Sequence, residues 1–204
     1  MVVIVDYKIG NLGSVLNMLK RLDVPAAISC DPAEIRQADK LILPGVGAFE
    51  KGMGNLNEMG LVPLLREAVL EGSKPLLGIC LGMQLLTSRS EEGAVAGLGW
   101  IEGETIRFRV DHQSGLKIPH MGWNSVRPVR TDTLFRGLDK ESAFYFAHSY
   151  HVVCAAKADI LATCDHGYEF VCSVQKGNVF GIQFHPEKSH RFGLTLLKNF
   201  AELA

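Results

Sequence analysis

Short apolar runs that alternate with helical patterns in the first half of the chain constrain the fold most strongly. The runs VVIVDY (2–7), KLILPGVGAF (40–49) and KPLLGIC (74–80) are continuously apolar at their centres. Strands of this kind are buried on both faces, as in a parallel sheet that helices cover on both sides. AAISC (26–30) is a weaker run between the first two. The pattern therefore predicts an α/β fold built on parallel strands.

Helices are expected between these strands. Apolar residues recur at helical spacing within 13–22, a longer helical stretch covers about 54–71, and another helix is expected over 81–88. Asp31, directly before Pro32, is a candidate N-cap of a further short helix. The first half of the chain is thus expected to form the parallel part of the sheet together with its covering helices.

Beyond about residue 98 the pattern changes to strands joined by short turns. KGN at 176–178 is typical of a hairpin turn, and the amphipathic segment 193–203 predicts a C-terminal helix. No linker, repeat or low-complexity segment divides the chain. We expect a single domain over residues 1–204, with a mixed, mostly parallel central sheet flanked by helices and a smaller antiparallel extension.

Composition argues against several classes of protein. The 204 residues carry 21 basic and 22 acidic side chains, a net charge of −1, which predicts no long-range attraction to nucleic acid or to a lipid surface. No apolar stretch is long enough to span a membrane, and the first residues form an expected strand rather than a signal peptide. We expect a cytoplasmic protein that binds neither nucleic acid nor membranes.

The five cysteines are odd in number, and none falls in a Cys-x-x-Cys pair. This argues against a disulfide framework and against a zinc ribbon, and it favours a reducing compartment. We therefore predict no bound metal. Cys30, Cys154, Cys164 and Cys172 are expected to be small buried side chains, whereas Cys80 requires a different explanation.

Cys80 lies between two glycines at the end of an expected buried strand, in the sequence GICLG (78–82). Gly-x-Cys-x-Gly between strand and helix has the spacing of the Gly-x-Ser-x-Gly nucleophile elbow, in which the nucleophile occupies a sharp, strained turn. Amides at the start of the following helix would favour the reactive thiolate. The pentapeptide alone is equally compatible with a core cysteine between two flexible glycines.

A cysteine nucleophile requires a base, and seven histidines are available. His185 in VFGIQFHPEKS (179–189) ends a strongly apolar strand, where the active sites of parallel sheets are found. Glu187 follows two residues later, and its carboxylate is suited to orient the imidazole and to stabilise its charged form. Taken alone, His-Pro-Glu is more typical of a histidine at a strand end beside a solvated glutamate.

Acyl transfer also requires hydrogen-bond donors to the oxyanion. One is the backbone N–H of Leu81, directly after the nucleophile. A second is expected from PGVG (44–47), at Val46 or Gly47, because this loop follows a neighbouring parallel strand and glycines let backbone amides approach a ligand. Pro-Gly-x-Gly alone is an unspecific loop motif.

Three stretches together carry a family resemblance: LPGVGAF, GICLGMQLL and FGIQFHPEKS. They resemble the class I, triad-type glutamine amidotransferases, whose three-layer α/β fold is flavodoxin-like. IVDYKIGNLGSV, IPHMGWNSV and AFYFAHSYHV further resemble the glutaminase subunits of imidazole glycerol phosphate synthases. The resemblance covers nearly the whole chain.

The resemblance implies a reaction and a set of binding residues. Cys80 would attack the side-chain amide of glutamine, His185 would move the proton to the departing ammonia, and Glu187 would orient His185. A glutamyl thioester on Cys80 would then be hydrolysed to glutamate, with no cofactor. Residues at the family's glutamine-binding positions are Gly47, Gln84, Glu92, His148, Ser149 and Tyr150. An exposed helix position for Gln84 and a core position for Tyr150 are the alternatives.

The same resemblance implies a partner. Members of this family form a heterodimer with a (β/α)₈-barrel cyclase of histidine biosynthesis and deliver ammonia along a sheltered route, because ammonia released into water is protonated and no longer a nucleophile. Residues near the docking face are Asn11, His120, Met121, Gly122, Trp123 and Lys188. Trp123 is equally suited to a core position or to an exposed interface position.

Several alternatives remain open from the sequence. A second copy of this subunit type would supply ammonia to a related synthase of another pathway, such as surface-polysaccharide synthesis. Triad glutaminases of other biosynthetic pathways are disfavoured by the stretches PHMGWN and DYKIGNL. A catalytically inactive binding subunit is disfavoured by the complete triad, and a cysteine peptidase would act on peptides without a partner.

Overall fold

The computed structural model describes residues 1–111, 113 and 115–203, and within them an eleven-stranded mixed sheet forms the centre of the molecule. Its strands are β1 (Val2–Val5), β2 (Ala26–Ser29), β3 (Lys40–Gly45), β4 (Leu76–Cys80), β5 (Arg89–Ser90), β6 (Gly103–Arg107), β8 (Arg127–Pro128), β10 (Tyr150–Cys154), β11 (Ile160–Asp165), β12 (Glu169–Lys176) and β13 (Val179–Ile182). The main path of the sheet runs in the order β2-β1-β3-β4-β13-β12-β10-β6-β5.

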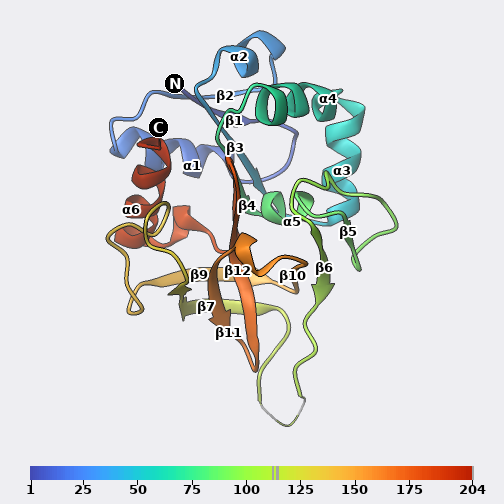
Figure 1. Cartoon of the computed structure of the whole chain (residues 1–204), viewed down its shortest axis with the longest axis vertical. Helices are drawn as coiled ribbons and strands as arrows, with labels where there is room; N and C mark the ends of the chain where they lie inside the picture. Colours follow the sequence, from blue (N-terminus) through green and yellow to red (C-terminus); the bar gives the residue numbers. More distant parts are fainter. Residues whose placement is uncertain (112, 114, 204) are drawn as a thin grey trace.

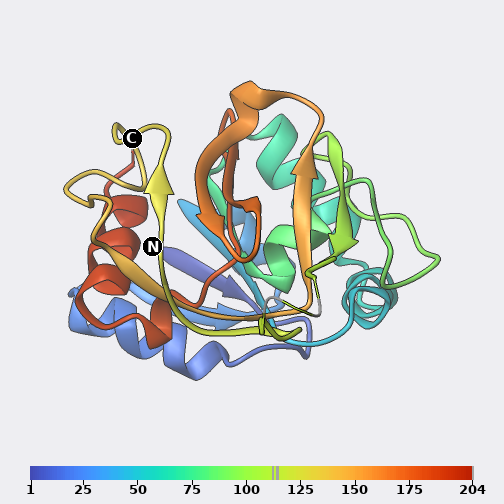
Figure 2. The same cartoon turned by 90° about the horizontal axis from the view of Figure 1, so that it is seen from below.

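The four predicted strands β2, β1, β3 and β4 lie side by side in parallel, and β13 from the second half of the chain extends this parallel part next to β4. Helices α1 (Leu12–Arg21) and α6 (His190–Ala201) lie on one side of it. Helices α3 (Phe49–Glu58), α4 (Leu61–Arg66) and α5 (Leu81–Leu85) lie on the other (Figure 1). The view from below shows the same three layers, with α1 and α6 next to each other (Figure 2).

Two apolar cores lie on opposite faces of the parallel strands. Ile4 and Ile42 belong to the core under α1 and α6, whereas Val3 and Leu41 belong to the core under α3 and α4. All four side chains are fully buried. Because both faces of these strands are covered, both sets of alternating residues must be apolar, which explains the uninterrupted apolar runs in the sequence.

Beyond β13 the strand pairs are antiparallel as far as β6, and the short edge strand β5 then pairs with β6 in parallel. β12 pairs with β13 across the predicted turn at 176–178, and both β10 and β11 pair with β12. The strands β7 (His120–Ser125) and β9 (Ala143–His148) form a separate two-stranded antiparallel sheet. The expectation of a mixed α/β sheet with a smaller antiparallel extension is therefore confirmed.

The long helix expected in the first half begins earlier and is interrupted. α3 starts at Phe49, Gly60 is left-handed (φ 66°) between α3 and α4, and the helix ends as a π-helical turn over Glu67–Glu71. Glu92 explains the early start, because its carboxylate accepts a hydrogen bond from the Phe49 N–H at 2.9 Å while the N-cap position itself provides no side-chain acceptor. Helical periodicity does not reveal a cap supplied by a distant residue.

The other helical expectations differ less from the structure. Asp31 caps α2 (Pro32–Gln37) as predicted, accepting hydrogen bonds from the N–H groups of Ala33 and Glu34. α5 is shorter than the helix predicted over 81–88. The 3₁₀ turns η3 (Lys157–Asp159) and η4 (Pro186–Lys188) lie in the second half of the described residues. None of the helices in the described ranges has the length and apolar character needed to cross a bilayer.

Candidate active site

Cys80 is the last residue of β4 and directly precedes α5. Its backbone has φ 54° and ψ −108°, a conformation that non-glycine residues rarely adopt. Strain of this kind costs about 1–3 kcal/mol and persists where the surrounding fold enforces it. The turn has the geometry of a nucleophile elbow, and it places the thiol at the carboxyl end of a buried parallel strand.

Glycine is a steric requirement on both sides of this turn. A Cβ at Gly82 would lie 1.8 Å from the carbonyl oxygen of Leu43 on the neighbouring strand. A Cβ at Gly78 would lie 2.7 Å from the carbonyl group of Gly82. Both distances are far shorter than a van der Waals contact, so only glycine lets β4, β3 and α5 approach closely enough to form the turn at Cys80.

His185 follows β13 and meets Cys80 from the next strand of the sheet. Its Nδ1 lies 2.8 Å from Oε1 of Glu187, and the two side chains are 3% and 4% exposed. Burial lowers the pKa of His185, but hydrogen bonds and negative charge from Cys80 and Glu187 outweigh burial and raise this pKa to about 10. The structure therefore brings the expected nucleophile, base and orienting carboxylate together, and it favours the charged imidazole.

Gln183 is a polar residue of this site that the sequence patterns did not single out. It is fully buried, its Nε2 donates to the sulfur of Cys80 at 3.6 Å, and its Oε1 accepts from Nε2 of Gln84 at 3.1 Å. One signal was available: Gln183 precedes His185 by two residues, and residues two apart in an extended segment point to the same face.

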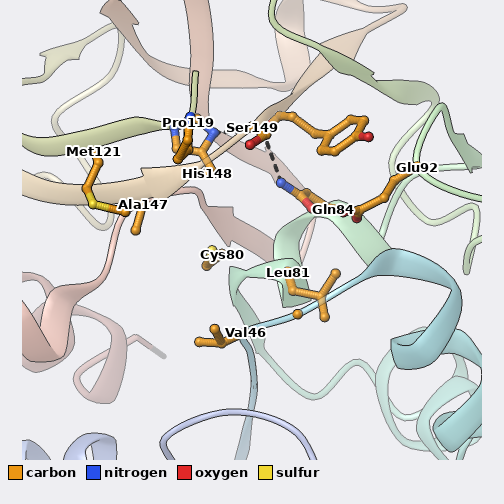
Figure 3. Close-up of a pocket in the computed structure, with 12 residues that line it drawn as sticks. Val46, Cys80, Leu81, Gln84, Glu92, Pro119, Met121, Ala147, His148 and Ser149 are labelled. Atoms are coloured by element: carbon orange, nitrogen blue, oxygen red, sulfur yellow. Dashed lines mark hydrogen bonds between the residues drawn. The ribbon is translucent and has the colours of Figure 1, made fainter. Parts of the chain in front are cut away.

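A pocket of about 260 Å³ opens beside Cys80 (Figure 3). It is lined by Val46, Gly47, Cys80, Leu81, Gln84, Glu92, Pro119, Met121, Ala147, His148, Ser149 and Tyr150. All six residues expected to bind glutamine are among them, together with the expected oxyanion donors. Residues from five separate stretches of the chain, including the helix α5, thus line the pocket that holds the sulfur.

Gln84 and Tyr150 are joined across this pocket. Nε2 of Gln84 donates to the carbonyl oxygen of Tyr150 at 3.1 Å, the dashed line in Figure 3. Gln84 is 5% exposed, so it is not an exposed helix residue, and Tyr150 is only half-buried. Glu92 faces the same pocket while its Oε2 caps α3, so one carboxylate both starts a helix and presents negative charge to the pocket.

Four residues expected at a docking face lie on the surface around the pocket and the His185–Glu187 pair. Met121 and Trp123 are 64% and 48% exposed, and Asn11 and Lys188 are exposed as well. The indole of Trp123 is therefore on the surface and not in the core. Its ring stacks on the imidazole of His190, with 5.2 Å between ring centroids and 3° between ring planes.

His120 does not belong to this surface, in contrast to the expectation from the sequence. Its side chain is only 5% exposed, whereas the neighbouring Met121 points to solvent. The reason is the period of two along a strand, which places successive side chains of β7 on opposite faces. The imidazole of His120 is therefore not available to a partner.

The other four cysteines are free and lie in surroundings unlike that of Cys80. Burial raises the pKa of Cys154 and of Cys164 to about 12, and it raises that of Cys172 above the usual range of a thiol. Cys30 is exposed, contrary to expectation, because it follows the edge strand β2. Across the described part of the chain, no three His, Cys, Asp or Glu side chains are placed to hold a metal ion.

Comparison with known families identifies the chain. The model of the family described as glutamine amidotransferase class-I matches residues 3–203. The chain belongs to the class I glutamine amidotransferase family. The family resemblance of the stretches around Gly47, Cys80 and His185 is thereby confirmed.

Individual relatives of this glutamine amidotransferase are similar along their whole length. It is 51% identical over 203 residues to "Imidazole glycerol phosphate synthase subunit HisH 2" of Pseudomonas aeruginosa, with 100% of both chains covered. It is 52% identical over 203 residues to subunit HisH of the same enzyme from Moorella thermoacetica, with 99% of this chain and 94% of the relative covered. The predicted resemblance to this type of subunit is confirmed.

Solved structures share the fold of this amidotransferase. One described as a glutamine amidotransferase has a TM-score of 0.75 at 22% identity, with 100% of both chains covered. A glutamine amidotransferase from Thermotoga maritima has a TM-score of 0.70 at 18% identity, with 99% of this chain and 98% of the other covered. At these identities the likeness shows the fold alone.

Proposed function

We propose that this protein hydrolyses glutamine to glutamate and ammonia as the glutaminase subunit of imidazole glycerol phosphate synthase, and that it passes the ammonia to a (β/α)₈-barrel cyclase in histidine biosynthesis. The observation that carries the proposal is the position of Cys80, at a strained turn beside the buried His185–Glu187 pair and in the wall of the pocket. Similarity to HisH subunits over the full length supports the pathway.

The first half of the reaction forms a thioester. The sulfur of Cys80 attacks the side-chain amide carbon of glutamine, and the electrons of the C=O bond move to the oxygen, toward the N–H groups of Leu81 and of the Val46–Gly47 loop. His185 carries the proton of the thiol and transfers it to the nitrogen as the C–N bond breaks. Ammonia leaves, and a glutamyl thioester remains. The raised pKa of His185 supports this role, because a charged imidazole can donate its proton to the departing nitrogen.

The second half of the reaction restores the enzyme. Water attacks the thioester carbon, His185 accepts the proton of the water, and the C–S bond breaks as the proton returns to the sulfur. The sum consumes one glutamine and one water and yields one glutamate and one ammonia. Glu187 keeps the imidazole oriented and stabilises its charge in both halves.

Glutamine would be held by the residues that line the pocket around Cys80. The carboxylate of Glu92 is suited to the ammonium group of the substrate, and Gln84 and the backbone at 148–150 provide hydrogen-bonding groups. Two roles for Glu92, capping α3 and binding the ammonium, are compatible because a carboxylate has two oxygens.

We propose that the barrel cyclase docks on the exposed surface formed by Asn11, Met121, Trp123 and Lys188. Apolar exposed side chains such as Met121 and Trp123 are typical of the centre of an interface. This surface adjoins the pocket, since Met121 contributes to both. Ammonia formed at Cys80 therefore has a short way to a partner bound there.

A second candidate function has the same chemistry and a different acceptor. The relatives from Pseudomonas aeruginosa and Methanococcus maripaludis carry the number 2 in their names, and a relative from Campylobacter jejuni carries the number 1. The numbers indicate that an organism can carry more than one subunit of this type, and we infer that a second copy would supply ammonia to a related synthase of another pathway.

The test is glutamate release from glutamine by the purified chain, measured alone and in the presence of the barrel cyclase and its ligand. The ligand that the family resemblance implies is a ribulosyl-formimino aminoimidazole carboxamide ribotide. We expect release to increase sharply when both are added, and Cys80→Ala to reduce it by a factor on the order of 10⁶. Synthesis from an ammonium salt should survive Cys80→Ala, and the exposed Cys30→Ala is the matched control that leaves glutamine turnover unchanged.

Three results would contradict or redirect the proposal. Loss of ammonium-dependent synthesis in an intact Cys80→Ala complex would refute the division of labour between the subunits. Peptide cleavage by the isolated chain would indicate a cysteine peptidase. Glutamine turnover that responds only to a different barrel synthase would favour the second candidate function.

A further inference from the structure

A chain of hydrogen bonds runs from the inner face of β7 to the pocket beside Cys80. Nδ2 of Asn124 lies 3.2 Å from Nε2 of His120, and Nδ1 of His120 lies 3.2 Å from Nε2 of His148. Nδ1 of His148 lies 2.7 Å from the carbonyl oxygen of Tyr150. Both imidazoles are buried, and the chain ends on two residues that line the pocket, whereas His120 does not line it.

The pocket end of this hydrogen-bond chain determines which nitrogen of each imidazole, His148 and His120, carries the hydrogen. The carbonyl oxygen of Tyr150 can only accept, so Nδ1 of His148 must donate. A neutral imidazole has one N–H, so Nε2 of His148 is an acceptor. Nδ1 of His120 must then be the donor to it, and Nε2 of His120 must be an acceptor.

The opposite end assigns the same tautomer independently. Nδ2 of Asn124 also donates to the carbonyl oxygen of Asp165 at 2.7 Å, and Oδ1 of Asn124 accepts from the N–H of Ser125 at 2.9 Å. The amide orientation is therefore determined, and its Nδ2 faces His120 as a donor. Nε2 of His120 must accept, so its hydrogen is on Nδ1, in agreement with the pocket end.

Both rings must be neutral for this chain to exist, and their surroundings favour that form. Burial, assisted by the nearby His166, lowers the pKa of His120 to about 4. Burial also lowers the pKa of His148, against a smaller effect of its bond to the Tyr150 carbonyl. A proton added to either ring would set two donors against each other.

The carbonyl of Tyr150 connects this chain to the side chains beside the nucleophile. It also accepts from Nε2 of Gln84 at 3.1 Å, and the second hydrogen of that amide goes to Oε1 of Gln183 at 3.1 Å. Gln183 in turn donates to the sulfur of Cys80. The position of one carbonyl group, held by the two imidazoles, thus affects both the wall of the pocket and the groups around the sulfur.

We propose that His120 is a positioning residue for glutamine: by donating from Nδ1 to His148, it holds the 148–150 segment and Gln84 in the geometry that binds the substrate. This role rests on the proposed function, because it assumes that glutamine occupies the pocket. It also accounts for a buried imidazole on a strand whose other face is exposed.

Two substitutions at one position test the proposal by steady-state kinetics with glutamine. His120→Phe retains a ring that can stack on Phe146 and His166, but it has no donor. We expect the KM for glutamine to rise on the order of tenfold and kcat to change less than about threefold, as for loss of one buried hydrogen bond. His120→Asn places an amide N–H near the former Nδ1 and should return KM to within about threefold of the unaltered protein.

His166→Phe is the matched control, because it removes a neighbouring buried imidazole without breaking a link of the chain; its KM should be unchanged. An unchanged KM in folded His120→Phe overturns the proposal, as does an asparagine variant that is no better than the phenylalanine variant. If His120→Phe does not fold, the proposal is tested by NMR of the unaltered protein with isotope-labelled histidine, which identifies the ring nitrogen that carries hydrogen. At pH 7 both His120 and His148 should carry hydrogen on Nδ1 alone, and an Nε2–H tautomer at His120 overturns the proposal.

Failure of the proposed function is distinguishable from failure of this inference. If the unaltered protein releases no glutamate in the presence of partner and ligand, the proposed function fails and the role for glutamine fails with it. Normal release by the unaltered protein, combined with an unchanged KM in His120→Phe, overturns the role of His120 alone.

Discussion

Nδ1 of His185 lies 2.8 Å from Oε1 of Glu187, and both side chains are almost completely buried. A negative charge at this distance in a buried site stabilises the charged form of the imidazole. Burial alone would lower the pKa of His185, yet hydrogen bonds and charge from Cys80 and Glu187 raise it to about 10. The imidazole beside the thiol is therefore protonated over the physiological range.

This pair predicts how stability depends on pH. The pKa of His185 is above the value of about 6.5 in an unfolded chain, so the stabilisation is complete below about pH 6.5 and is lost as the pH rises through about 10. Glu187→Gln keeps a hydrogen-bond acceptor and removes the charge. We expect it to lower the free energy of unfolding by about 1–3 kcal/mol at neutral pH and by much less above about pH 10. Urea unfolding at both pH values measures this, and an equal loss at both would contradict it.

The turn at Cys80 predicts a large effect of one methyl group. Gly82→Ala would place a carbon 1.8 Å from the carbonyl oxygen of Leu43, so β3 and α5 must separate. We expect a loss of about 2–4 kcal/mol in the free energy of unfolding, together with loss of glutamine turnover. Gly54→Ala in α3 is the control, because nothing lies within 4 Å of the added Cβ. It should stabilise the protein by about 0.5–1 kcal/mol, and similar effects of the two substitutions would refute the steric argument.

Glu92 combines a structural and a proposed substrate-binding role, and two substitutions separate them. Glu92→Gln keeps an oxygen for the Phe49 N–H, so stability should change by less than about 0.5 kcal/mol. Glu92→Ala removes the cap and should destabilise the protein by about 1 kcal/mol. If the carboxylate binds the substrate ammonium, both variants should raise the KM for glutamine about tenfold. An unchanged KM in Glu92→Gln would leave the carboxylate with the capping role alone.

The exposed indole of Trp123 predicts a loss of partner affinity without a loss of stability. Trp123→Ala should weaken binding of the barrel cyclase by about 2 kcal/mol, roughly thirtyfold, measured by titration calorimetry. Leu70→Ala is the control, since Leu70 is also exposed (40%) but precedes β4, at the end opposite Cys80. Equal affinities of the two variants would show that the partner docks elsewhere.

Much of the fold and of the chemistry was predictable because the signals are local. The uninterrupted apolar runs reflect strands covered on both faces, and the cap at Asp31 acts on N–H groups two and three residues away. The glycines that permit the turn at Cys80 are Gly78 and Gly82, close to it in the sequence. Glu187, which bonds to His185, likewise follows it closely in the sequence. Such patterns can be read from a short segment of sequence, because the residues that interact are close to one another along the backbone.

The amino-acid sequence by itself predicted the type of fold, and it pointed to Cys80, His185 and Glu187 as the proposed nucleophile, base and orienting carboxylate. Only the tertiary structure decided that Glu92 caps α3, that Gln183 faces the sulfur, and that His120 points inward. Each of these depends on which strand or helix packs against a residue far away in the chain. Local propensity carries no information on such contacts, because they arise only when the distant elements bury their apolar faces together.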